Sequence, residues 1–127
     1  MKHAAILLAA VAFAVAASAA AAAPRLRPIM RDWKAQAGRA ELMLTGAVPY
    51  DEAEVRRILT ALVGDARDVE AGIAGSSAQA LDVKDRFSQF EADAAATLQA
   101  AGTPGGARAR FQRVAADCRS CHDALRN

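Results

Sequence analysis

The chain has 127 residues, of which 54% are hydrophobic, and 16 basic side chains stand against 14 acidic ones for a formal net charge of +2. This length is that of a single domain, and the near-balance of charge, without a basic run or an aromatic platform, argues against nucleic-acid binding. Alanine is abundant, few residues after position 23 are β-branched, and no stretch alternates at period two. The chain is therefore expected to be all-α.

Residues 1–23 have the pattern of a secretory signal peptide. A short basic start is followed by the apolar stretch 6–15, and small residues precede Pro24. A retained membrane anchor is the alternative, but this apolar stretch is shorter than the ~20 residues that a transmembrane helix needs. We expect cleavage, export to the periplasm, and a mature domain of residues 24–127 without stable membrane insertion.

Four amphipathic helices are predicted after this segment, because apolar residues recur there at steps of three and four. The first should run from about 28 to 45 and end at Gly46. The second should begin at Asp51, where Glu54 completes a capping-box pattern. The third and fourth are expected at about 78–101 and 103–125. Short connections join successive helices, which favours an antiparallel up-down-up-down four-helix bundle. In that topology the start of the first helix lies beside the end of the last.

The last predicted helix carries the five-residue motif Cys118-Arg119-Ser120-Cys121-His122. C-x-x-C-H is the attachment signal of a c-type haem. Two thiols on one face of a helical turn can both add to the vinyl groups of one haem edge, and the following histidine can bind the iron as proximal ligand. Haem attachment requires a compartment outside the cytosol, so the signal peptide supports this interpretation. We expect one covalent haem c, inserted between the helices.

Three other interpretations of the two cysteines compete with haem attachment. A dithiol redox motif normally accompanies a βαβ pattern, and no strand is predicted. A structural zinc ion takes four ligands, and the only other histidine is His3, inside the predicted signal peptide. The two cysteines could also simply pack in a core.

A sixth iron ligand would decide between electron transfer and gas binding. Met30 lies one turn into the first predicted helix, on its inner stripe and at the end that should hold His122. Met43 follows thirteen residues later on the same helix, ~20 Å away along the axis. Ordinary core packing is the alternative role for Met30. Trp33, one turn after Met30, is expected to pack near the haem.

The motif on the last helix of a bundle, followed within a few residues by Arg126, resembles the class II c-type cytochromes, the cytochrome c′ family. The segment Gly46-Ala47-Val48-Pro49-Tyr50-Asp51 is similar to the glycine-x-x-proline-tyrosine-aspartate turn of that family. Counting back from this turn places Met30 on the segment that supplies the axial methionine in the low-spin branch. The resemblance covers essentially the whole mature chain.

The resemblance implies a periplasmic carrier of single electrons with a low-spin iron held by His122 and Met30, docking to redox partner proteins. It also implies a possible homodimer. No acid–base or nucleophile constellation is present, so we do not expect an enzyme. The alternative within the family is a high-spin, five-coordinate cytochrome c′ that binds nitric oxide or carbon monoxide. An exported bundle without haem, with a thiol pair, is a third hypothesis.

Overall fold

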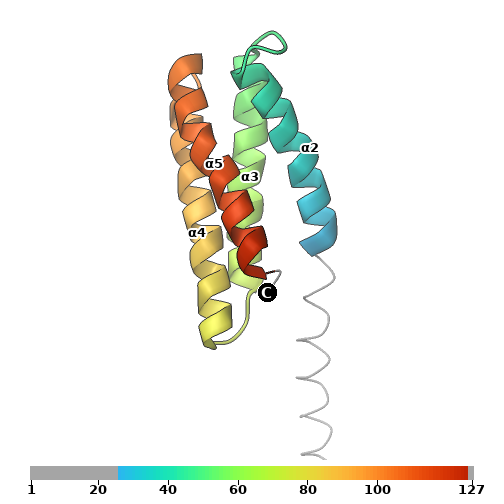
Figure 1. Cartoon of the computed structure of the whole chain (residues 1–127), viewed down its shortest axis with the longest axis vertical. Helices are drawn as coiled ribbons and strands as arrows, with labels where there is room; N and C mark the ends of the chain where they lie inside the picture. Colours follow the sequence, from blue (N-terminus) through green and yellow to red (C-terminus); the bar gives the residue numbers. More distant parts are fainter. Residues whose placement is uncertain (1–25, 126–127) are drawn as a thin grey trace, which may run out of the picture.

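The structure, a computed structural model, describes residues 26–125. Within that range the chain forms four helices and no strand, as predicted, and the helices lie side by side in a bundle (Figure 1). They are α2 (Leu26–Leu44), α3 (Glu52–Gly72), α4 (Ala78–Gln99) and α5 (Pro104–Leu125). The predicted signal peptide and its cleavage site lie outside the described residues. Among the helices described here, none combines the length and the apolar character that crossing a membrane requires.

The ends of the helices follow the predicted signals closely. The carboxylate of Asp51 accepts the backbone N–H of Glu54 at 3.0 Å, so Asp51 caps α3 as predicted. The second half of the capping box is replaced by an interhelical pair, because the Glu54 carboxylate lies 3.1 Å from Nε of Arg39 on α2. Gly46 follows α2 with a φ of 81°, as expected for the glycine that ends a helix.

The start of α4 depends on a cap that the sequence analysis did not single out. The hydroxyl of Ser77 accepts the backbone N–H of Ala80 at 3.1 Å. A serine in this position satisfies one of the free N–H groups at a helix start. The connection between α3 and α4 therefore also fixes where α4 begins.

The core is centred on α3. Its inner side chains are fully buried, and α4 packs extensively against both α3 and α5. The fully buried members on α3 include Val55, Ile58, Leu59 and Leu62. Helix α2 contacts α3 and α5 less extensively, and toward its first residues it leans away from the other helices (Figure 1). The bundle is thus least closely packed where α2 begins.

Candidate cofactor site

A cavity of about 410 Å³ lies between α2, α4 and α5. Its lining reaches from the first turn of α2 to the last turn of α5. It comprises Leu26, Arg27, Met30, Arg31, Trp33, Val83, Arg86, Phe87, Phe90, Asp117, Cys118, Cys121, His122 and Leu125. Its volume falls in the range of about 300–1,000 Å³ that is usual for small-molecule sites.

The cavity brings together the four residues that the sequence analysis selected. Cys118, Cys121 and His122 reach it from α5, because positions three or four apart on a helix share one face. Met30 reaches it from α2. Met30 and both thiols are half-buried, whereas the ring of His122 is exposed. Residues from opposite ends of the described chain therefore meet at one site.

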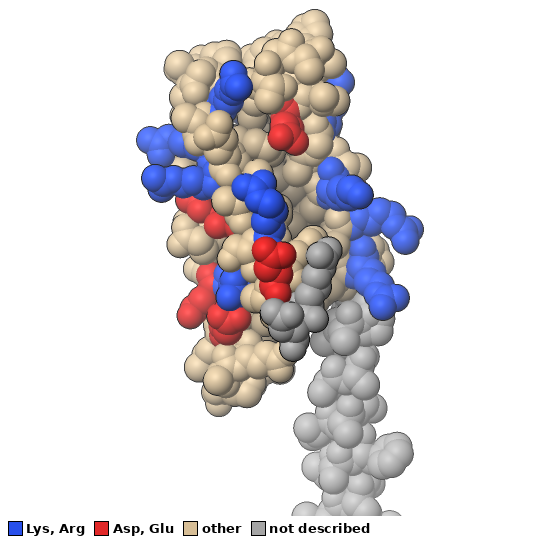
Figure 2. Space-filling view, in the orientation of Figure 1, with Lys and Arg blue, Asp and Glu red and all other residues tan. Residues whose placement is uncertain are grey.

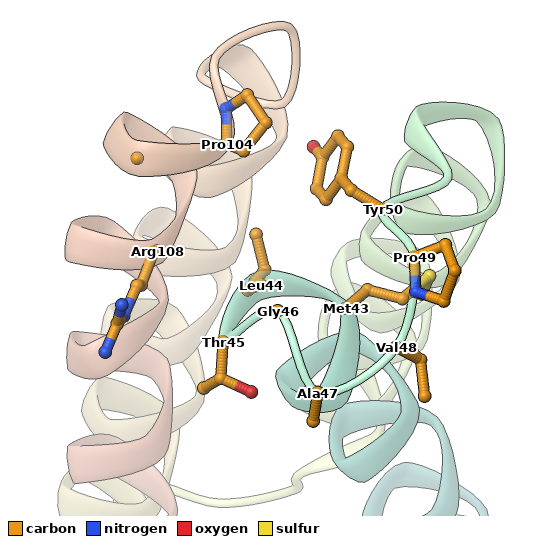
Figure 3. A pocket seen from close by; sticks show the side chains of 11 residues that line it. Met43, Leu44, Thr45, Gly46, Ala47, Val48, Pro49, Tyr50, Pro104 and Arg108 are labelled. Atoms are coloured by element: carbon orange, nitrogen blue, oxygen red, sulfur yellow. The ribbon is translucent and has the colours of Figure 1, made fainter.

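The second methionine of α2 lies elsewhere. Met43 is 1% exposed and lines a shallow pocket near the turn between α2 and α3. Figure 3 shows Met43 and Tyr50 there, with Pro104 and Arg108 of α5 nearby. The Tyr50 hydroxyl donates a hydrogen bond to the carbonyl of Ala101, which ties this turn to the segment before α5. Met43 does not line the cavity that holds the two thiols.

Aromatic rings from two helices form part of the cavity lining. The indole of Trp33 stacks on Phe90, with centroids 4.6 Å apart, and meets the edge of Phe87 at 6.0 Å. Its Nε1–H donates to Oδ2 of Asp65 on α3 at 3.1 Å. The indole is therefore held by α3 and α4 while it lines the cavity from α2.

The two thiols lie in surroundings that favour their neutral form. Burial raises the pKa of the Cys118 thiol, and the neighbouring Asp117 raises that pKa further. Burial also raises the pKa of the Cys121 thiol, against a lowering by Arg86. Both cysteines therefore remain thiols rather than thiolates at neutral pH.

Sequence reasoning missed a pair of carboxyl groups beside the cavity. Asp93 of α4 is 9% exposed and accepts a hydrogen bond from Nε2 of Gln89 at 2.9 Å. Burial, together with the neighbouring carboxyl group of Asp93, raises the pKa of Asp117 to about 6. The helical spacing of α4 could have indicated that Asp93 is buried. Asp93 lies three residues after Phe90 and four before Thr97, on the buried stripe of that helix.

Among residues 26–125, no group of three or more His, Cys, Asp or Glu side chains is arranged to hold a metal ion.

Comparisons with family models, with curated protein sequences and with solved structures gave no match to this chain.

Proposed function

We propose that the protein is a periplasmic class II c-type cytochrome of the cytochrome c′ family that holds one covalent haem c and carries single electrons. We also propose the topology of the bundle: residues 24–127, after loss of the signal peptide 1–23, form an antiparallel up-down-up-down four-helix bundle. The observation that carries it is the shared cavity. Both cysteines of the C-x-x-C-H motif, its histidine and the only methionine at that end of α2 line one space.

Each of these residues has a role that its chemistry suits. Cys118 and Cys121 would anchor the haem through thioether bonds, and His122 would be the proximal iron ligand. Met30 would be the sixth ligand in a low-spin, His/Met-ligated site. Haem bound in this way supplies reversible one-electron chemistry, and a thioether ligand raises its reduction potential.

The remaining lining also fits such a group. The rings of Trp33, Phe87 and Phe90 present apolar surface to a flat aromatic cofactor. Arg27, Arg31 and Arg86 line the same cavity, and their charge is opposite to that of the haem carboxylates. Residues from three helices therefore offer apolar contact together with charge compensation.

The thiol environment favours this proposal over a dithiol redox function. Catalytic cysteines of C-x-x-C motifs have a lowered pKa, because the thiolate is the reactive form. Here burial raises the pKa of both thiols. Cysteines that serve as covalent anchors need no lowered pKa in the mature protein.

The test is the optical spectrum of the protein after co-expression with a haem-maturation system, in the ferric and ferrous forms. Met30→Leu removes the sulfur with little change in volume, and Met43→Leu is the matched control at the other end of α2. We expect covalent haem in all three proteins. A low-spin spectrum with a methionine–iron charge-transfer band should be lost in Met30→Leu alone.

Other results would select the other hypotheses. A high-spin spectrum that neither substitution changes would remove Met30 as a ligand and favour the gas-binding cytochrome c′, which native ferrous protein would reveal by binding carbon monoxide. A chain that acquires no covalent haem would leave the thiol-pair hypothesis.

A further inference from the structure

Charge is distributed unevenly over the four helices. Four basic side chains stand against two acidic ones on each of α2 and α5, whereas α3 has three against five and α4 has two against four. Figure 2 shows Lys and Arg predominating on the face formed by α2 and α5. The cavity with the two thiols lies between these basic helices and α4.

On α2 three basic side chains follow one another along one side. Arg27, Arg31 and Lys34 are separated by steps of four and three, so they share a stripe of the helix. Arg27 and Arg31 line the cavity, so the stripe runs along its edge. Arg39 belongs to the other side, since it pairs with Glu54 of α3.

A second basic stripe lies on α5. Arg108 and Arg119 are eleven residues apart, about three helical turns, and therefore point the same way. Arg108 lines the pocket beside the turn that follows α2 (Figure 3). His122, one turn after Arg119, lines the cavity. The stripe of α5 thus faces the side of α2.

These two stripes form what we call the basic groove: Arg27, Arg31, Lys34, Arg108 and Arg119, all of them exposed. None of the five forms an ion pair with another described residue. The ion pairs of residues 26–125 instead use Arg39, Arg56, Arg67 and Arg86. Arg27 and Arg31 line the cavity and can compensate haem carboxylates, whereas Lys34, Arg108 and Arg119 do not line it. The charge of these three residues remains available to attract an anionic surface.

We propose that the basic groove docks an acidic surface of another protein, which would be the electron partner. The identity of the partner as a redox protein rests on the proposed function, whereas the docking rests on the charges alone. Complementary charge around a cofactor opening steers a partner to the place from which an electron can pass.

Two other occupants fit less well. A second copy would have to present its acidic face, where four of the nine carboxylates of α3 and α4 already pair with arginines, those of Glu52, Glu54, Asp82 and Glu91. An anionic membrane would be expected to meet an apolar patch as well. The large exposed apolar side chains of the described residues, Leu42, Leu81 and Leu125, are instead spread over α2, α4 and α5.

The first experiment maps binding without any electron transfer. The purified, haem-loaded protein, labelled with ¹⁵N, is titrated with a polyglutamate peptide and followed by NMR. We expect shifts confined to the groove residues and lost at high salt. Lys34→Glu/Arg119→Glu should weaken binding at least about tenfold. Arg57→Glu/Lys84→Glu is the matched control, because it makes the same charge change with residues of α3 and α4 that have no ion pair among the described residues.

The second experiment measures oxidation of the reduced protein by hexacyanoferrate(III), an anionic reagent, at low salt. The groove variant should react about tenfold more slowly, and the control variant should stay within about twofold of the unsubstituted protein. The haem content of each variant is measured first, since Arg119 lies within the C-x-x-C-H motif.

The two proposals fail in different ways. A protein without haem would defeat the proposed function, yet peptide shifts in the groove would still support docking. A haem-loaded protein in which both double variants behave alike would overturn the docking site and leave the proposed function intact. Preferential binding to phosphatidylglycerol vesicles, or self-association reduced by the groove variant, would also overturn it.

Discussion

The indole of Trp33 on α2 stacks on the ring of Phe90 on α4, with the two planes inclined by 10°. Both rings line the cavity that holds the thiols of α5. Trp33 is the only tryptophan of the chain, and its hydrogen bond to Asp65 fixes the indole in this position. Tryptophan fluorescence therefore reports on the cavity itself.

Trp33 emission should be strongly quenched in the haem-loaded protein. Haem absorbs at the wavelengths at which tryptophan emits, so a haem in contact with the Trp33–Phe90 pair would take up the excitation energy. We expect emission to rise several-fold when the loaded protein is unfolded in guanidinium chloride. Steady-state fluorescence at matched protein concentration measures this.

A variant that cannot attach haem gives the control. Cys118→Ala/Cys121→Ala removes both thioether bonds. The Trp33 emission of this folded variant should be close to that of the haem-loaded protein after unfolding. Equal emission from the folded, haem-loaded protein and this variant would place the haem away from the cavity.

Most of the fold was predictable because its determinants are local. The four helices were indicated by apolar spacing, and their ends by residues whose backbone chemistry is specific. Gly46 takes a positive φ at the end of α2, and Asp51 caps α3 through its side chain. Such signals act over a few residues, so a single sequence contains them in full.

The site was only partly predictable, because part of it depends on packing between distant segments. The thiols and His122 form a contiguous motif, whereas Asp117 acquires its raised pKa only because it is buried and meets Asp93 of another helix. The basic groove was missed for the same reason. Arg31 of α2 and His122, one turn after Arg119 on α5, line the same cavity, which is known only after the two helices are placed.

Asp117→Asn should remove a pH dependence of stability. The pKa of Asp117 rises from 3.8 to about 6 on folding, so the folded state binds this proton more tightly than the unfolded chain does. The free energy of unfolding should therefore fall as pH rises from about 4 to 6 and then level off. Two pKa units correspond to about 3 kcal/mol at most, and partial exposure of Asp117 reduces the expected cost to about 1–2 kcal/mol.

Asparagine keeps the shape of the side chain and can donate to Asp93. The variant should lose the slope between pH 4 and 6 and be about 1–2 kcal/mol more stable at pH 7.5. Guanidinium unfolding at four pH values checks this, with the exposed Asp123→Asn on the same helix as control. A slope that persists in Asp117→Asn would assign the pH dependence to another group.

The same substitution at two glycines should have opposite effects. At Gly46, φ is 81°, a conformation that alanine adopts only with strain, so Gly46→Ala should destabilise the fold by about 1–2 kcal/mol. Gly64 lies inside α3, where an added Cβ would meet nothing within 4 Å. There alanine restricts the unfolded chain, and Gly64→Ala should stabilise the fold by about 0.5–1 kcal/mol.

Urea unfolding of the two variants, with unchanged m-values, measures both effects. Steric room for the added methyl group is the same at the two positions, because a Cβ at Gly46 would also meet nothing within 4 Å. Opposite signs would thus arise from backbone conformation alone. If both variants were stabilised, the turn after α2 would tolerate an L side chain, and the glycine of the Gly46–Asp51 segment would not be required by its backbone angle.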